Sequence, residues 1–344
     1  QERIQSVDLF RLLAVFAVIV IHTQPFAGSS RPLIGVLNLP ILLNQGARFA
    51  VPFFFVIAGY FWATKFNATQ SPRAATVHLA KRAAFLFLAW SVIYMVPTQV
   101  REIDTHGLSH APKLVYWHAL AMLNAPWTTL FEGSKVHLWF LSSLFLCVLI
   151  SGAALAYRRT RLLVALAVLL YGVGLAGKAY ADTPLGFHSA FNFRNGPFFG
   201  LLFFVTGYLL QRRGAKRCWL PLGGVLTGLG LVLHLVEISA LHAHYQTPLA
   251  HDYVLGTVFM GVGVAFMALS NAKVFCVGKP TSGGRLALGI YALHFVMIDL
   301  LAPLDQVYHD AHAWELINPL LVFALAYVAA WAFSRHRMLR TLVA

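Results

Sequence analysis

Val7-Asp-Leu-Phe-Arg-Leu-Leu-Ala-Val-Phe-Ala-Val-Ile-Val-Ile-His22 is an apolar stretch that contains three residues a bilayer penalises, namely Asp8, Arg11 and His22. On a helix each residue advances by about 100° and about 1.5 Å, so the eleven steps from Arg11 to His22 end roughly 20° past three full turns and about 16 Å along the axis. Asp8 lies close to the same stripe. An acid, a guanidinium and an imidazole aligned in hydrocarbon indicate a functional site, whereas each residue alone is equally compatible with a snorkelling Arg or a hydrogen-bonded His.

The composition excludes an ordinary soluble domain. Of 344 residues, 59% are hydrophobic and 11% are charged, whereas a soluble domain has roughly 25% charged residues. We therefore expect a polytopic protein of the lipid bilayer in which residues 1–344 form a single membrane-embedded domain with no appended soluble domain. The net charge of +14 does not indicate nucleic acid as a partner, because the Lys and Arg residues are spread over several loops. The three cysteines match no metal-binding pattern, so no metal is expected.

Apolar segments long enough to cross a bilayer recur along the chain. A crossing helix needs about 20 predominantly apolar residues. The stretch 112–126 is shorter and predicts an interfacial or re-entrant helix, with Tyr116 and Trp117 at the level of the lipid headgroups. The segments that fit predict an all-α bundle of about ten transmembrane helices, at residues 9–26, 40–62, 83–100, 137–156, 162–180, 197–211, 219–240, 253–270, 286–303 and 317–333.

The loops between these segments differ in charge. Eighteen Lys and Arg residues fall on one side of the predicted bundle and six fall on the other. Cytoplasmic loops contain the excess of Lys and Arg, so the richer side is predicted to be cytoplasmic. Ten crossings then place both termini in the cytoplasm.

Two of the predicted helices begin with similar sequences. Residues 48–60 and 194–208 both run from an Arg through Pro-Phe-Phe to Gly-Tyr. In the predicted topology these helices point in the same direction, so a repeat would be parallel rather than inverted. Aromatic runs are common in apolar helices, and we favour chance similarity as the explanation.

Four motifs, in this order, resemble the acyltransferase-3 family of integral membrane acyltransferases. Arg11 and His22 match the family's Arg-x10-His pattern in the first span. The second span, residues 48–60, is similar to a basic residue followed by Val-Pro-x-Phe-Phe-x-x-Ser-Gly-Tyr. Residues 137–141 match a His-Leu-Trp-Phe-Leu motif, and residues 290–294 match Ile-Tyr-x-x-His. The resemblance covers essentially the whole chain.

The resemblance implies a function. Members of the family transfer an acyl group, usually acetyl, from a coenzyme A donor to a hydroxyl, commonly on a cell-envelope glycan. For this chain it implies acetyl-CoA as the acyl donor, a polysaccharide or lipid-linked glycan as the acceptor, and a place in the bacterial inner (cytoplasmic) membrane. The chain departs from the family's pattern at Ala58 and at Ala287-Leu288, where a Ser is common, and local helix packing is expected to differ there.

The predicted catalytic residues are His22, Arg11 and Arg48. Ester formation needs a base for the acceptor hydroxyl, and a neutral imidazole such as that of His22 is suited to taking the proton. The planar guanidinium of Arg11 suits the phosphates of the donor. Arg48 is expected either to polarise the acceptor or the thioester carbonyl, or to form a structural pair with an acid such as Glu237 or Asp299.

Further residues are assigned to the two substrates. Asp8, Lys81 and Arg82 are expected to help Arg11 to bind the donor, although Asp8 is equally compatible with an ordinary acid at a helix N-terminus. Four residues are expected to contact the acceptor: His137, Trp139, His294 and Arg194. Of these, His294 is assigned on the resemblance alone, and the pair of His137 and Trp139 also fits an interfacial anchor.

Two alternatives stay open at this point. His234 and Glu237 share a helix face at positions i and i+3, which suggests an orienting pair or a buried hydrogen bond. A membrane transporter or flippase for a small polar solute or glycan precursor is the alternative function, because buried charges also mark solute pathways. The lack of an inverted repeat and the scarcity of broken helix pairs in the sequence argue against transport.

Overall fold

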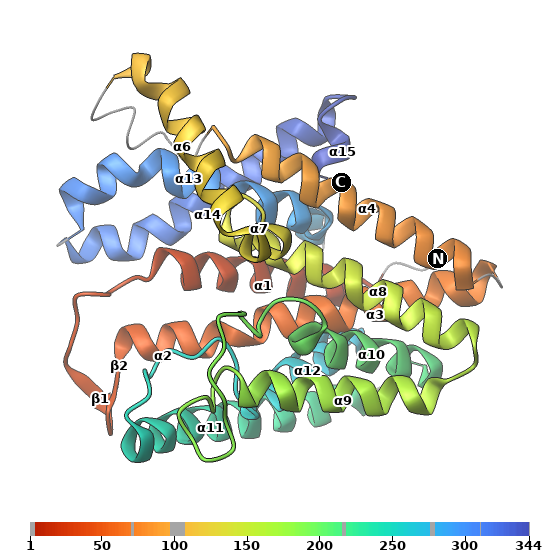
Figure 1. Ribbon diagram of the computed structural model, residues 1–344. Helices are drawn as coiled ribbons and strands as arrows, with labels where there is room; N and C mark the ends of the chain where they lie inside the picture. The colour runs from red at the N-terminus through yellow and green to blue at the C-terminus, as the bar shows by residue number, and fades with distance from the viewer. Residues whose placement is uncertain are drawn as a thin grey trace.

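The computed structural model describes residues 4–69, 72–96, 107–214, 218–275, 279–309 and 311–343. Helices form almost all of the ordered structure in these ranges, and the strands β1 (Pro32–Ile34) and β2 (Leu37–Asn38) form one short antiparallel hairpin. The α-helices, labelled in Figure 1, are α1 (Gln5–Thr23), α2 (Leu39–Gly46), α3 (Ala50–Thr69), α4 (Pro72–Ile93), α6 (Ala111–Asn124), α7 (Pro126–Glu132), α8 (Trp139–Ala156), α9 (Thr160–Ala176), α10 (Pro197–Arg213), α11 (Trp219–Tyr245), α12 (Gly256–Leu269), α13 (Ala287–Tyr308), α14 (His312–Arg335) and α15 (Arg340–Val343).

The predicted class of fold is confirmed, because each of the ten predicted segments overlaps a helix. Residues 97–100, at the end of the third predicted span, lie outside the described residues. At three of the predicted spans the helix is shorter than the roughly 20 residues that a crossing needs. These helices, α9, α10 and α12, have 17, 17 and 14 residues. The chain therefore forms an all-α membrane bundle, whereas ten crossings and cytoplasmic termini stay predictions. Within the described ranges, seven helical segments are long and apolar enough to cross a membrane: Gln5–Thr23, Leu39–Phe66, Arg73–Ile93, Val136–Ala156, Trp219–Tyr245, Gly283–Tyr308 and His312–Arg335.

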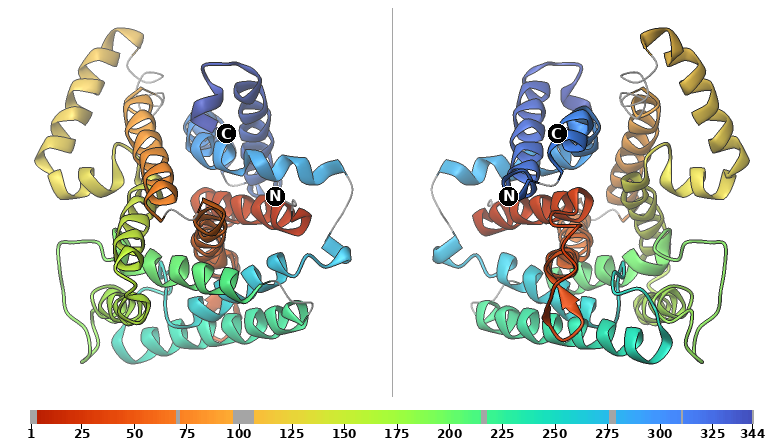
Figure 2. Two further views of the ribbon diagram at one scale, coloured as in Figure 1. Left: turned by 90° about the vertical axis from the view of Figure 1, so that its right-hand side faces the viewer. Right: turned by 90° about the vertical axis from the view of Figure 1, so that its left-hand side faces the viewer.

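Helix α1 lies at the centre of this bundle. It packs against α3 and α12 on one side and against α13 and α14 on the other. Figure 2 shows the blue C-terminal helices and the green-to-cyan helices on opposite sides of the red α1, with the yellow α6 and α7 projecting from the edge. The side chains of Ala14, Val15 and Ile19 are completely buried. The helix that contains Arg11 and His22 is therefore surrounded by protein over much of its length.

The predicted second span is interrupted. Asn38 caps α2 by accepting a hydrogen bond from the Ile41 N–H (3.1 Å), and the helix ends at Gly46. A single 3-10 turn, η1 (Ala47–Phe49), then leads into α3. A 3-10 turn is wound more tightly than an α-helix, so side chains project in different directions on its two sides. Arg48 lies within this turn.

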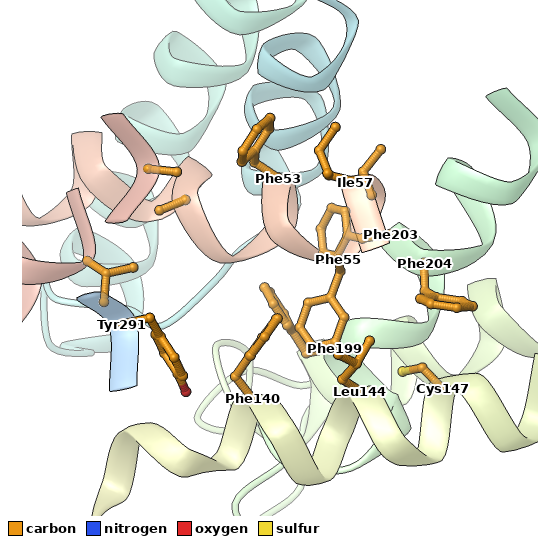
Figure 3. Packing of buried hydrophobic residues seen from close by; sticks show 14 of the residues in the cluster. Phe53, Phe55, Ile57, Phe140, Leu144, Cys147, Phe199, Phe203, Phe204 and Tyr291 are labelled. Atoms are coloured by element: carbon orange, nitrogen blue, oxygen red, sulfur yellow. The ribbon is translucent and has the colours of Figure 1, made fainter. Parts of the chain in front are cut away.

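Helices α3 and α10, which contain the two similar sequences, pack directly against each other. A Cβ atom on Gly59 would lie 2.0 Å from the carbonyl oxygen of Phe204, and one on Gly207 would lie 1.9 Å from that of Val56. The aromatic pairs Phe55–Phe199 and Trp62–Tyr208 show that the helices run in the same direction. Figure 3 shows the aromatic core that they form with α8. Glycines therefore set the distance between two helices that flank the polar interior.

We expect the substitution Gly207→Ala to destabilise the protein by about 1–3 kcal/mol, because the added methyl group would push α10 away from α3. The measurement is thermal unfolding of the detergent-purified protein. The control is Gly172→Ala in α9, where a Cβ atom meets nothing within 4 Å and helix propensity alone favours Ala by up to about 1 kcal/mol. Equal melting temperatures for the two variants would contradict the role of Gly207.

Candidate active site

The Arg11 end of α1 contains the predicted acid–base pair. The Nη1 atom of Arg11 lies 3.2 Å from Oδ1 of Asp8, one turn earlier in the helix. The guanidinium group also lies over the ring of Phe61, 5.1 Å from its centre. Asp8 is buried and Arg11 is partly exposed. The guanidinium group of Arg11 is thus oriented by the carboxylate of Asp8 and by the face of the Phe61 ring.

A cavity of about 330 Å³ extends from Arg11 into the bundle. Two arginines, Arg11 and Arg285, are its charged lining residues, and the rest of its wall is mainly apolar. Helices α1, α3, α4, α8 and α13 all contribute side chains, including Val18, Val51 and Tyr291. Such a cavity suits a ligand with an anionic group at one end and a long, mostly uncharged arm.

His22 lies next to the inner end of this cavity. A smaller space of about 50 Å³ is lined by His22, Arg48 and Trp139, and also by Val18 and Val51. Because Val18 and Val51 line both spaces, the cavity that begins at Arg11 adjoins the space at His22. The predicted common face of Arg11 and His22 therefore corresponds to adjoining cavities in the structure.

Two larger cavities adjoin His22 from the opposite end of the bundle. One, of about 470 Å³, has a wall rich in amides and charged groups, including Asn38, Asn44 and Arg48. The other, of about 530 Å³, is lined by His309 and His312 together with two acids. His22 therefore lines both cavities at this end of α1 and adjoins, across Val18 and Val51, the cavity at the other end. A reaction between two separately arriving substrates could use this arrangement.

A network of ion pairs fixes Arg48. Its Nη1 atom lies 3.0 Å from Oδ1 of Asp252, and its Nε and Nη2 atoms donate to Oδ1 of Asn44. The structural partner of Arg48 is therefore Asp252, and the two acids suggested by the sequence, Glu237 and Asp299, were wrong. Asp252 belongs to the loop before α12 and also pairs with Lys178 (3.2 Å) and Arg194 (3.6 Å). Burial opposes ionisation of Asp252, but Arg194, Arg48 and Lys178 together hold the pKa of this carboxyl well below its usual range.

Arg194 connects this network to a second acid. Its Nη2 atom lies 3.2 Å from Oε1 of Glu132, and its guanidinium stacks 5.0 Å above the ring of Trp139. The Nε atom of Arg194 is buried and has no hydrogen-bond partner among the described residues. Arg194 and Trp139, both predicted to contact the acceptor, therefore lie together beside His22 and line the same 50 Å³ space.

The three predicted histidines form one cluster. The ring centre of His294 lies 5.5 Å from that of His22 and 5.1 Å from that of His137, and the ring of Phe295 packs against all three. The Nδ1 atom of His294 donates to the carbonyl of Tyr291, because a carbonyl can only accept. Its Nε2 atom, and both ring nitrogens of His137, are buried without a hydrogen-bond partner among the described residues. His294 therefore presents a free acceptor nitrogen close to His22.

The suggested pair of His234 and Glu237 does not form. His234 donates from Nε2 to Gln45 (2.9 Å) and accepts at Nδ1 from Thr257 (3.1 Å). Glu237 instead accepts from the N–H groups of Leu255 and Gly256 at the start of α12. A carboxylate is favoured at a helix N-terminus. Both residues therefore have structural roles in joining α11 to its neighbours.

The remaining predictions concern Lys81, Arg82 and metal binding. Lys81 is exposed, and Arg82 donates to the carbonyl of Thr341 (3.1 Å). Neither residue lines the Arg11 cavity, so their help in donor binding stays a prediction. Arg285 does line it and was missed, because no spacing in the sequence relates residue 285 to residue 11. Among the described residues, no group of three His, Cys, Asp or Glu side chains is arranged for a metal ion.

Comparison with known proteins identifies the family to which the chain belongs. The family model described as "Acyltransferase domain" matches residues 4–335 of the chain. The chain therefore belongs to the acyltransferase-3 family, as the motifs predicted.

Three curated proteins show weaker similarity. An amino-acid racemase of Enterococcus faecalis is 24% identical over 345 residues, which cover 96% of this chain and 46% of that protein. A serine/alanine racemase of Enterococcus gallinarum is 26% identical over 306 residues, which cover 84% of this chain and 40% of that protein. The chain spans less than half the length of these relatives, so the racemase activity in their names belongs to the longer proteins. No solved structure matches the chain significantly.

The loop that provides Asp252 gives a prediction about pH. His251 is buried, and burial is the main cause that lowers the pKa of its imidazole to about 4. The unfolded chain takes up this proton at about pH 6.5, so the stabilising effect of neutral His251 is complete above that pH and is lost as the pH falls toward about 4. We expect His251→Gln to reduce the loss of melting temperature between pH 7 and pH 4.5. The same substitution at the exposed His188 should leave this loss unchanged, and an identical pH profile for His251→Gln and the wild type would contradict the assignment.

Proposed function

We propose that the protein transfers an acyl group, in the first place acetyl, from acyl-CoA to a hydroxyl of a cell-envelope glycan or lipid-linked glycan. The observation that supports this most directly is the convergence of cavities on His22 from both ends of α1. A transfer between substrates from opposite sides of a membrane requires such a meeting point. The membrane-embedded part performs the reaction in this proposal.

The donor occupies the Arg11 cavity. Its phosphates bind at Arg11, which Asp8 orients through their ion pair, and a guanidinium is suited to phosphate through its planar set of donors. The uncharged arm of the donor lies along the apolar wall, and the thioester reaches the small space between Val18, Val51 and His22. The 50 Å³ volume of this space favours a short acyl group such as acetyl.

The acceptor arrives through the amide-rich 470 Å³ cavity. His22 removes the proton from its hydroxyl, and the oxygen attacks the thioester carbonyl carbon. The tetrahedral intermediate collapses with cleavage of the carbon–sulfur bond, the ester is released, and the proton held by His22 passes to the departing coenzyme A thiolate. Arg48 and Arg194 line the same space, and their charges stabilise the negative oxygen that develops during attack.

The three other predicted acceptor residues support this centre. Trp139 fixes the guanidinium plane of Arg194 by stacking. His137 and His294 form the wall behind His22. We assign them to binding and positioning rather than to proton transfer.

A transporter would use the same converging cavities, so the alternative function is retained. Purified protein in sealed vesicles separates the two possibilities. Hydrolysis or transfer of the labelled acetyl group of acetyl-CoA supports the enzyme. Accumulation of a polar solute inside vesicles, without any chemical change in acetyl-CoA, supports transport. For the enzyme, loss of an acetyl ester from envelope glycans on deletion of the gene would identify the acceptor.

We expect His22→Ala to lower turnover of acetyl-CoA by about 10²–10⁴-fold, because removal of a general base has effects of this size. Binding of coenzyme A should persist, since Arg11 is untouched. Turnover is measured with purified protein and labelled acetyl-CoA, and His188→Ala, at an exposed loop position, is the control. Wild-type turnover in His22→Ala would exclude His22 as the base.

A further inference from the structure

Gly284 brings a separate segment of the chain against the beginning of α1. This residue belongs to η6 (Lys279–Leu286), the 3-10 segment that precedes α13 and packs against α1. A Cβ atom on Gly284 would lie 2.3 Å from the carbonyl oxygen of Asp8 and 2.5 Å from its Cα atom. Contacts this short are impossible for any other residue without movement of the backbone, so glycine is required for this approach.

The close approach determines the position of the next residue, Arg285. Arg285 and Gly284 both line the 330 Å³ cavity, together with Arg11. Arg285 is exposed whereas Arg11 is partly buried, so Arg285 lies where the cavity opens. Two arginines from segments more than 270 positions apart therefore share one otherwise apolar cavity.

The charges at this opening do not balance. Asp8 pairs with Arg11, and within the part of the chain that the structure describes no carboxylate pairs with Arg285. One positive charge is thus left at the mouth of a cavity whose remaining wall is mainly apolar. A ligand with a phosphate at one end and an uncharged arm complements both the charge and the wall.

We propose that Arg285 is a second phosphate-binding residue for the acyl-CoA donor, held beside Arg11 by the contact between Gly284 and Asp8. This inference rests on the proposed function. Arg285 contacts the donor first because it is exposed, and Arg11 binds a phosphate deeper in the cavity. The arm then extends toward Val18 and Val51, which adjoin His22.

An anionic phospholipid has the same chemistry, a phosphate followed by an apolar chain. The test therefore compares ligands as well as variants. The affinity of the full-length protein for coenzyme A is measured by calorimetry in nanodiscs of neutral lipid and again in nanodiscs that contain phosphatidylglycerol. Hydrolysis of S-acetylpantetheine, which has the arm and the thioester but lacks the nucleotide, is measured in parallel.

For Arg285→Ala we expect the Kd for coenzyme A to rise at least about tenfold, as for the loss of a charge-assisted hydrogen bond. The kcat/KM for S-acetylpantetheine should stay at the wild-type value. Arg285→Lys should recover part of the affinity, because it keeps the charge but not the planar set of donors. Gly284→Ala should also raise the Kd, because its added methyl group would push Arg285 away from Asp8 and Arg11, with folding checked by thermal unfolding.

The matched control is Arg335→Ala at the end of α14. Arg335 stacks on Trp331 at 5.0 Å and does not line the cavity, so its removal should leave the Kd for coenzyme A unchanged.

Each other outcome overturns the inference in a recognisable way. If the wild type binds coenzyme A and Arg285→Ala binds it with the same Kd, the role of Arg285 is refuted but the proposed function is not. Equal losses for coenzyme A and S-acetylpantetheine mean that Arg285 shapes the cavity rather than binding phosphate. If phosphatidylglycerol weakens coenzyme A binding by the wild type but not by Arg285→Ala, while the two proteins have the same Kd in neutral nanodiscs, the pair is a lipid site. Failure of the wild type itself to bind coenzyme A removes the proposed function together with this inference.

Discussion

Asp252 is the carboxylate on which the polar interior depends. It joins Arg48 in the turn before α3, Lys178 after α9 and Arg194 before α10. Removing one partner of a buried ion pair typically costs about 3–5 kcal/mol, because the other charge is left without compensation. Separation of these segments would therefore leave partly buried cations without their carboxylate. The position of His22 against Arg48 and Arg194 follows from this constraint.

Helix α1 combines a structural and a functional role. Its apolar side chains pack on both halves of the bundle, and Arg11 and His22 each line a cavity. A cost of several kcal/mol for each ionised side chain in hydrocarbon explains why Arg11 needs Asp8 and the ring of Phe61. The proposed chemistry uses these residues in the order in which they occur along the helix, with the donor's charge at one end and the reacting thioester at the other.

The sequence could predict those features that depend on local periodicity. The stripe of Asp8, Arg11 and His22 follows from the helix repeat, and the helical class of the fold follows from long apolar segments. Arg48 shows the limit of this reasoning, since its partner Asp252 lies in a loop 204 positions away. The turn η1 was also missed, because apolar residues continue on both sides of it and composition alone does not register the break.

Arg285 was missed for a different reason. Its position depends on the close contact of Gly284 with Asp8, and a glycine next to an Arg gives no signal of a distant neighbour. The clustering of His22, His137 and His294 could be inferred only from the family motifs, because three separate helical segments bring these rings together. The features that could not be predicted from the sequence therefore depend mostly on contacts between residues far apart in the chain.

The narrow space between Val18, Val51 and His22 has a consequence for the membrane itself. In the proposed arrangement, the cavities at the two ends of α1 open on opposite sides of the membrane, and the side chains around this space then separate the two aqueous compartments. A membrane under a voltage of 100 mV drives each elementary charge with about 2.3 kcal/mol. The apolar valines and the excess of fixed positive charge around His22 must then also act as an insulator that keeps protons and metal cations from leaking through the protein.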